Sequence, residues 1–170
     1  MKFLVFSDTH NYLNNVKNVI NNFINDINAI IHLGDHDKDA KLLSEIYSNI
    51  DFYYIKGNND YNLTTPESMI ININNKKIII THGHKQNVYW GYDSIYYWAQ
   101  ENLADAVFFG HTHKPFNSKL DNIYLFNPGS ISMPRGIKNP TFGIFEVDDY
   151  GNMNGKIMNY LNEDNFVDFD

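Results

Sequence analysis

Cysteine is absent from this chain of 170 residues. The absence excludes a disulfide framework and every thiolate metal site, so a metal bound here must be held by His, Asp, Glu or Asn. The sequence also lacks any run of about 18 or more apolar residues, which argues against a membrane-spanning helix. Because the polar residues SDTHN interrupt the first apolar run, no signal-peptide core follows Met1, and we expect a cytoplasmic protein.

Positive charge is scarce as well. The chain has 13 Lys and Arg residues against 20 Asp and Glu, its formal net charge is −7, and Arg135 is its single arginine. Extended nucleic-acid surfaces need clustered Lys and Arg, so we expect none here. The length and a hydrophobic content of 43% fit one domain over residues 1–170. The sequence leaves open whether the chain forms a homo-oligomer.

Strands and helices alternate through the first third of the chain. The apolar run 2–6 predicts a strand, and the apolar spacing over 16–24 predicts an amphipathic helix. Residues 28–35 and 41–50 repeat this pattern, and 51–60 predicts a further strand that runs into a Gly-Asn turn. Alternating strands and helices indicate a parallel sheet.

The pattern changes after Pro66. Residues 68–84 predict a hairpin around Asn74-Asn75, and 88–103 predicts a helix. We interpret the many aromatic side chains at its start as core, with an oligomer surface or a platform for stacking bases as the alternatives. Further strands are expected at 105–110, 116–120, 122–126, 141–147 and 155–161. Two mixed sheets packed face to face, with helices outside, fit this order better than a single doubly wound sheet.

Residues that can bind a metal stand at the ends of five expected strands. His111 and His113 are two positions apart, so their side chains point to one face. The full set of N and O donors is Asp8, His10, Asp35, Asn58, His82, His111 and His113. One ion rarely takes more than about six ligands, so this count predicts two ions that share a carboxylate.

The motifs DTH, LGD, GNND, THGH and GHTH resemble, in this order, the metal-binding motifs of the calcineurin-like metallophosphoesterases. The segment NPGSISMPRG, residues 127–136, extends the resemblance, and the small size is similar to that of the compact prokaryotic YfcE-type phosphodiesterases. The resemblance implies a four-layer αββα sandwich. It also implies a dinuclear phosphodiesterase that hydrolyses a small-molecule phosphoester by attack of a metal-bridging hydroxide.

The resemblance also implies the division of the ligands. One ion would be held by Asp8, His10, Asp35 and His113, and the other by Asp35, Asn58, His82 and His111. The mixed shell of His, carboxylate and Asn suits several divalent metals without choosing among them; we expect Mn²⁺, with Fe, Ni, Zn, Co or Mg as alternatives.

One residue departs from the pattern of many phosphatases in that family. They carry a histidine where this chain has Asn59, which cannot act as a general acid near neutral pH. His84 shares a face with His82 and is a candidate for contact with the substrate phosphate. Arg135 follows NPGS and is a candidate for bidentate phosphate binding. Surface roles stay open for both.

The remaining polar residues of these loops have less specific interpretations. We interpret His36 as a solvated loop residue that points away from the site, and His32 as a hydrogen-bonded core histidine. Asp37 and Asp39 flank Lys38, the position at which the extended G-D-x-x-D motif has a second acid.

Three rival functions can be compared with the donor set. A non-catalytic metal-binding scaffold for protein interaction, with the same fold, is the main alternative, although all seven ligand positions are filled. A metallo-β-lactamase-like hydrolase needs the string H-x-H-x-D-H, which does not occur. A mononuclear iron oxygenase would leave four donors without a role.

Overall fold

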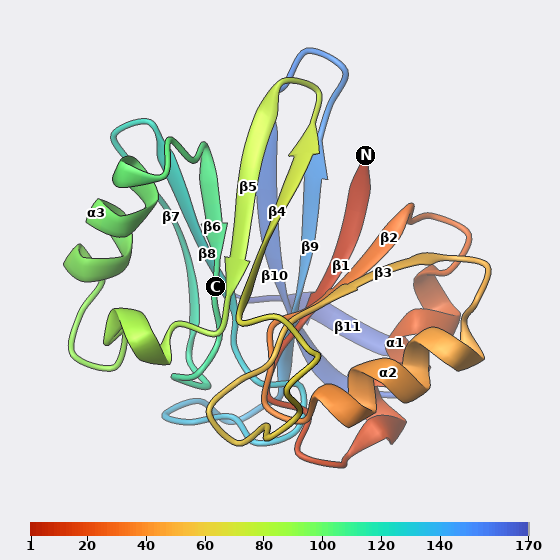
Figure 1. Ribbon diagram of the computed structural model, residues 1–170. Coiled ribbons are helices and arrows are strands. Elements are labelled where there is room, and N and C mark those ends of the chain that lie inside the picture. Colours follow the sequence, from red (N-terminus) through yellow and green to blue (C-terminus); the bar gives the residue numbers. More distant parts are fainter. Residues whose placement is uncertain (170) are drawn as a thin grey trace.

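The computed structural model describes residues 1–169, and it places two β-sheets face to face with helices on both outer sides (Figure 1). The larger sheet has the strand order β11-β10-β9-β1-β2-β3, and the smaller sheet has the order β4-β5-β6-β8-β7. Parallel and antiparallel pairs occur in both sheets. This arrangement confirms the predicted αββα sandwich; the last residue of the expected domain, Asp170, lies outside the described residues.

The bounds of the elements are as follows. The larger sheet consists of β1 (Lys2–Phe6), β2 (Ala29–His32), β3 (Asp51–Tyr54), β9 (Thr141–Val147), β10 (Met153–Asn162) and β11 (Asn165–Asp168). The smaller sheet consists of β4 (Ser68–Ile73), β5 (Lys76–Thr81), β6 (Ala106–Phe108), β7 (Pro115–Leu120) and β8 (Ile123–Pro128). The helices are α1 (Leu13–Phe23), α2 (Asp37–Ile46) and α3 (Asp93–Glu101), and His84–Gln86 forms a single 3₁₀ turn, η1.

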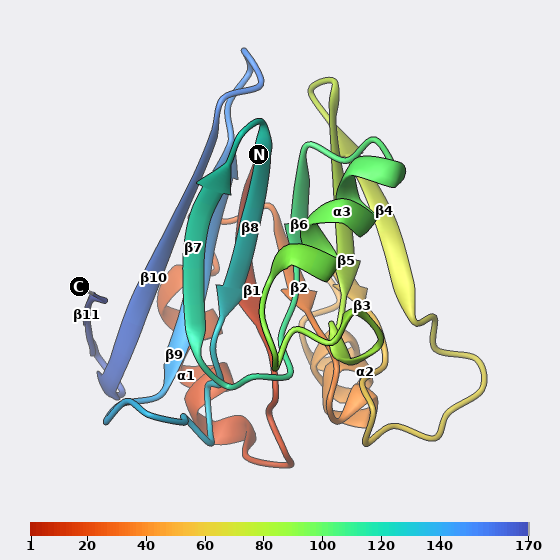
Figure 2. The same ribbon diagram turned by 90° about the vertical axis from the view of Figure 1, so that its left-hand side faces the viewer.

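Three apolar layers hold the sandwich together. The central layer lies between the sheets and contains Phe3, Val5, Ile80, Phe108, Phe126 and Phe145, all fully buried. An outer layer joins the larger sheet to α1 and α2, and another joins the smaller sheet to α3 (Figure 2). Strands β1 and β2 therefore place apolar side chains on both faces, as expected for parallel strands covered on two sides.

The parallel strands bring their carboxyl ends to one end of the sandwich. In the larger sheet β1, β2 and β3 are parallel neighbours, and in the smaller sheet β5 and β6 are parallel neighbours. The N–H of Gly110, which follows β6, donates to the carbonyl of His82, which follows β5, at 3.1 Å. Loops at this end are therefore fixed to one another, which is the arrangement that α/β folds use for sites.

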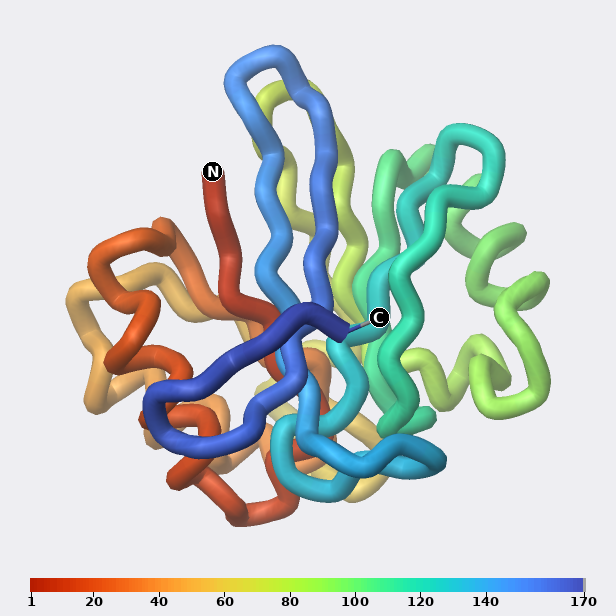
Figure 3. The backbone as a smooth tube through the Cα atoms, turned by 180° about the vertical axis from the view of Figure 1, so that it is seen from behind, coloured from red at the N-terminus to blue at the C-terminus, as the bar shows by residue number. Residues whose placement is uncertain are grey.

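Two elements differ from the sequence prediction. The helix expected from residue 88 begins at Asp93, because Asn87 and Gly91 have φ of +54° and +146°, which a right-handed helix does not accept. The strand β11 was not predicted. It folds back beside α1 (Figure 3), where the ring of Phe166 lies 5.5 Å from that of Phe23.

Within residues 1–169, no helix combines the length and the apolar character needed to cross a bilayer.

Candidate metal centre

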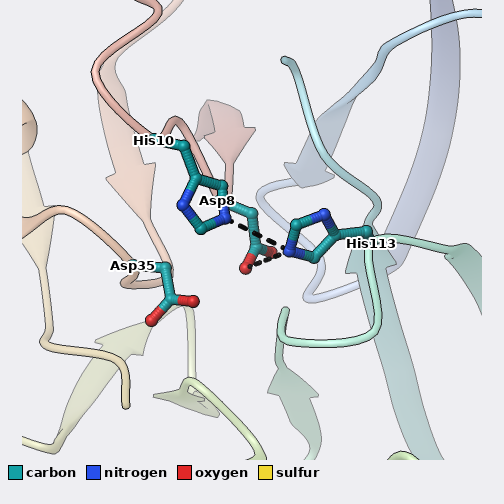
Figure 4. Close-up of side chains that lie close together, drawn as sticks. All are labelled: Asp8, His10, Asp35 and His113. Atoms are coloured by element: carbon teal, nitrogen blue, oxygen red, sulfur yellow. Dashed lines mark hydrogen bonds and ion pairs between the residues drawn. The ribbon is translucent and has the colours of Figure 1, made fainter. Parts of the chain in front are cut away.

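Four of the predicted ligands meet at the carboxyl ends of β1 and β2 and after β6. One ligand atom from each of Asp8, His10, Asp35 and His113 lies within 4.8 Å of the others, and Figure 4 shows the four side chains around a common space. Asp8 and Asp35 are almost completely buried. Two buried carboxylates beside two imidazoles form a donor set of the kind that divalent cations take in proteins.

The hydrogen bonds of His113 decide which of its nitrogens faces Asp8. Its Nδ1–H donates to the carbonyl of Met133 at 2.6 Å. Nε2, which carries the lone pair of the neutral ring, then lies 3.2 Å from Oδ1 of Asp8 and 3.3 Å from Nε2 of His10. A backbone carbonyl that holds the distal nitrogen is the usual second partner of a metal-binding histidine.

The charges of this pair shift both pKa values. Burial raises the pKa of Asp8, but the hydrogen bond and charge of His113 and the charge of His82 outweigh burial and lower the pKa to about 2. Burial lowers the pKa of His113, whereas the hydrogen bond and the charge of Asp8 raise it, and the net shift is upward. Both shifts show that this space favours positive charge.

His82 repeats the geometry of His113 on the other side of Asp35. Its Nδ1–H donates to the carbonyl of Leu33 at 2.7 Å. Its Nε2 lies 3.1 Å from Oδ1 of Asn58, 3.4 Å from Oδ1 of Asp35 and 4.0 Å from Oδ1 of Asp8. The Asp35 carboxylate therefore has a histidine cluster on each side.

His111 and His84 complete this second group. The ring centre of His111 lies 5.1 Å from that of His82, and the His111 backbone N–H donates to Oδ2 of Asp8 at 3.2 Å. The His84 ring lies 5.5 Å from that of His82 and 6.1 Å from that of His111. Its Nδ1 is buried and has no hydrogen-bond partner among the described residues. All seven predicted donors thus lie in one contiguous group.

The backbone of the donors has an unusual conformation. Asp8, His10, Asp35, His111 and His113 all have φ between +47° and +67°, which is the left-handed region. Residues other than glycine adopt this region at a cost, and they are found there mostly in tight turns and functional sites. Each strand thus ends in a sharp turn that directs its last polar side chains toward the shared space.

Glycines allow the loops from neighbouring strands to approach closely. Gly34 has φ of +91°, and a Cβ on it would lie 2.6 Å from the backbone nitrogen of Gly57. Any larger residue at position 34 would therefore push the loop of Asn58 away from Asp35.

A cavity of about 530 Å³ opens beside the donors. Its wall consists of Asn11, His36, Asp37, Lys38, Asn59, Asp60, Tyr61 and Asn62. Asn59 joins this cavity to the centre, because its Nδ2 donates to Oδ2 of Asp35 at 2.6 Å.

Comparison with known proteins identifies the family of this chain. Residues 1–150 match the calcineurin-like phosphoesterase superfamily domain. This chain belongs to that family. A phosphodiesterase of Methanocaldococcus jannaschii is 30% identical over 166 residues, which cover 87% of this chain and 94% of the relative. The protein named as a probable metallophosphoesterase, YsnB, of Bacillus subtilis is 26% identical over 150 residues, covering 88% and 86%.

Solved structures of the calcineurin-like fold are similar as well. A conserved protein of Streptococcus pneumoniae, described as a predicted phosphoesterase, superposes with a TM-score of 0.76 at 30% identity, covering 93% of this chain and 88% of that one. Vps29 of Entamoeba histolytica, solved with Zn²⁺, has a TM-score of 0.76 at 21% identity and covers all of both chains. The second likeness shows the fold alone.

Acids that were not assigned from the sequence support the donors. Oδ2 of Asp39 accepts from Oγ1 of Thr9 at 2.7 Å and from the N–H of Asn11 at 2.9 Å, so it holds the loop that carries His10. The Thr9 hydroxyl in turn lies 3.1 Å from Nε2 of the fully buried His32. His32 is therefore the hydrogen-bonded core histidine that was expected.

Asp60 supports the neighbouring loop. It accepts the backbone N–H groups of His36, Asp37 and Gly57 at 2.8 to 2.9 Å. The motif GNND contained this acid, but only the fold shows that three N–H groups from two loops converge on it. Asp60 thus ties the loop after β2 to the loop after β3.

Three interpretations need correction or refinement. His36 is half-buried, and its ring lies 5.2 Å from that of His10, because the N–H bond to Asp60 fixes it beside the site rather than away from it. Arg135 is exposed, and its backbone N–H donates to the carbonyl of His113 at 3.2 Å. The aromatic stretch 88–98 is core only in part, since Tyr89, Trp90 and Tyr97 are exposed.

Proposed function

We propose that this family member is a divalent-metal-dependent phosphodiesterase whose centre holds two ions. Asp8, His10, Asp35 and His113 would hold one ion, and Asp35, Asn58, His82 and His111 would hold the other, with Asp35 shared. The support is the position of Asp35 between two histidine groups, 3.4 Å from Nε2 of His82 and within 4.8 Å of the other donor atoms. We expect Mn²⁺, and Fe, Ni, Zn, Co and Mg remain alternatives.

One observation carries the metal proposal. His82 and His113 both donate Nδ1–H to a backbone carbonyl, so the lone pairs on their Nε2 atoms face the oxygens of Asp35 and Asp8. Lone pairs that face each other in a buried space repel unless a proton or a cation lies between them. Apart from the rings of His113 and His82, the buried Oδ1 of Asp8 has no polar partner among the described residues, as expected for an atom whose partner is a cation.

The metal ions and the side chains around them would have different roles in the reaction. When bound, two divalent ions acidify a shared water, which supplies the nucleophile, and neutralise the charge of the phosphoryl oxygens. His84 would contact the phosphoryl group, since its ring adjoins those of His82 and His111 and one of its nitrogens lacks a partner. Arg135 would reach the phosphate from the loop that is joined to His113.

The side chains near Asp35 favour diesters with good leaving groups. Asn59 cannot donate a proton as an acid, and both carboxylate oxygens of Asp60 already accept backbone N–H groups. Burial and the charges of His82 and Lys85 lower the pKa of His84, so its ring is mostly neutral at pH 7. With no strong acid in place, a leaving group that is stable as its anion is cleaved fastest.

The rival proposal is a non-catalytic metal-binding scaffold for protein interaction. The Vps29 likeness is at the level of the fold, whereas all seven donors are present and adjacent in this chain. A scaffold would bind metal without turnover. Activity with a metal-loaded protein therefore separates the two proposals.

The test joins metal analysis with a substrate screen. Protein reconstituted with Mn²⁺ should contain two ions per chain and should hydrolyse bis(p-nitrophenyl) phosphate, and EDTA should abolish this activity. The screen is repeated with Fe²⁺, Ni²⁺, Zn²⁺, Co²⁺ and Mg²⁺, and an Asp8→Asn variant serves as the matched control. Two bound ions with no hydrolysis of any diester or monoester would favour the scaffold, and one ion at saturating Mn²⁺ would contradict the dinuclear centre.

A further inference from the structure

Two aromatic side chains stand exposed on an ordered turn between β5 and α3. Trp90 is 87% exposed and Tyr89 is 57% exposed. The turn is anchored on both sides: Val88 is buried, and the ring of Tyr92 packs 4.1 Å from that of Phe116. A hydrogen bond of 3.0 Å from the N–H of Trp90 to the carbonyl of Asn87 fixes the turn itself. The folded turn itself therefore holds these two rings outside the core.

These two rings adjoin the metal centre. The ring centre of Tyr89 lies 6.5 Å from that of His111 and 5.7 Å from that of Trp90, which it meets edge to face. Figure 1 places this turn at the end of the sandwich where β5 ends, which is the end that carries the donors. The rings of His111, Tyr89 and Trp90 thus follow one another. We name Tyr89 and Trp90 the aromatic platform.

The cation nearest to this turn along the chain is already paired. The nearest cation in the sequence, Lys85, donates to Glu67 at 2.5 Å. A group attracted here would therefore gain little from net charge and much from contact with aromatic faces. Planar π systems stack on Trp and Tyr, and such stacking does not depend on a particular hydrogen-bond pattern.

We propose that the aromatic platform binds a planar aromatic group attached to the phosphate, such as an aryl ring or a nucleobase. This inference rests on the proposed phosphodiesterase centre and names the class of ester that it prefers. The cavity next to Asn59, which does not include Tyr89 or Trp90 in its wall, leaves space for the second substituent of a diester.

The test measures binding, so it does not depend on turnover. Calorimetry on the Mn²⁺-loaded protein compares phenylphosphonate with methylphosphonate, which differ in the ring alone. We expect phenylphosphonate to bind about 5- to 100-fold more tightly, the range found for one stacked ring. The double variant Tyr89→Ala/Trp90→Ala should lose this preference while its affinity for methylphosphonate and its metal content stay unchanged.

The chain offers a matched control. Tyr97 is 60% exposed on α3, which runs away from the donor end (Figure 2), so Tyr97→Ala should keep the full preference. Trp90→Phe, which preserves a planar ring, should keep most of it. Equal affinities of the two phosphonates in the wild type, or a preference that survives in the double variant, would overturn the proposal. Failure of hydrolysis alone would overturn the proposed function and not this result.

A second pair of ligands separates the two sources of the planar group. Adenosine 5′-monophosphate is compared with ribose 5-phosphate in the same proteins. If the platform accepts a nucleobase, the nucleotide binds more tightly and loses this advantage in the double variant. If the ring effect appears for phenylphosphonate alone, the platform is specific for small aryl groups.

Discussion

Asn59 holds Asp35 by both oxygens of the carboxylate. Its Nδ2 donates to Oδ2 at 2.6 Å, and its backbone N–H donates to Oδ1 at 3.0 Å. The residue that replaces the histidine of many phosphatases thus orients the carboxylate proposed to join the two ions. Its amide group lies at the boundary between the centre and the adjoining cavity.

The first prediction concerns the leaving group. We expect kcat/KM to be higher for bis(p-nitrophenyl) phosphate than for p-nitrophenyl phosphate, and alkyl esters to react much more slowly. Asn59→His should accelerate alkyl esters by at least about 10-fold, since general acid catalysis contributes typically about 10²- to 10⁴-fold when well placed. Aryl esters should change little. A wild-type preference for the monoester, or no effect of the histidine on either class, would contradict this account of Asn59.

The second prediction concerns Asp35. Asp35→Ala should remove a donor from both ions and lower kcat/KM by at least about 10³-fold, because the metal ions contribute several kcal/mol of transition-state stabilisation. His10→Ala removes a donor from one ion and should cost less. Metal content measured on both variants should show the larger loss in Asp35→Ala. If Asp35→Ala equals or exceeds His10→Ala in activity, Asp35 is not shared.

The third prediction concerns the acid behind the His10 loop. Asp39→Ala leaves the buried Thr9 Oγ1 and the partly buried N–H of Asn11 without the Asp39 carboxylate, which should cost about 1–3 kcal/mol of unfolding free energy. It should also weaken Mn²⁺ binding by about 10- to 100-fold, as loss of a residue that positions a ligand does. Urea unfolding and calorimetric titration measure the two effects.

Asp39→Asn is the matched variant, because both donors use the same oxygen and an amide oxygen can accept both bonds. It should retain most of the metal affinity. If the asparagine variant is as weak as the alanine variant, the negative charge of Asp39 matters and not its geometry.

The fourth prediction is a pH dependence of stability in the metal-free protein. Burial lowers the pKa of His32 from 6.5 to about 4, despite the opposing charges of Asp39 and Asp8. Between these values the unfolded chain binds the proton and the folded chain does not. The stabilising contribution is therefore complete above about pH 6.5 and is lost as the pH falls toward 4, with a slope of at most about 1.4 kcal/mol per pH unit.

Replacing the ring tests this assignment. Urea unfolding in EDTA from pH 7 to pH 4 should show a smaller loss of stability in His32→Gln than in the wild type. Parallel curves for the two proteins would mean that other groups cause the acid sensitivity.

Much of this architecture follows from local sequence patterns. Parallel strands such as 2–6 have continuous apolar runs, and the candidate donors follow at once, so the strand ends and the grouping of these side chains could both be predicted. The hairpin around Asn74-Asn75 could also be predicted, because Asn is favoured in tight hairpin turns. The antiparallel strands β4 and β5 confirm it.

The rest depends on contacts between distant segments. Nothing local distinguishes Asp60, which accepts three N–H groups, from an exposed loop acid, and nothing local places the ring of His36 beside that of His10. The exposure of Trp90 was missed for the same reason, because an aromatic-rich helical pattern usually indicates core. The start of α3 was missed because Asn87 and Gly91 adopt positive φ, a choice that the apolar spacing does not reveal.

Five of the donors have a left-handed backbone, so the residues that suit metal binding at these positions are unfavourable for folding stability. Asp, Asn and His tolerate this conformation better than other side chains, yet each such residue still costs up to about 1–3 kcal/mol relative to glycine or a relaxed turn. Exchange of a donor such as His111 for glycine would relieve strain and remove a histidine from the centre in one step. Loss of the donors in favour of glycine would thus stabilise the fold while it removes the candidate metal centre.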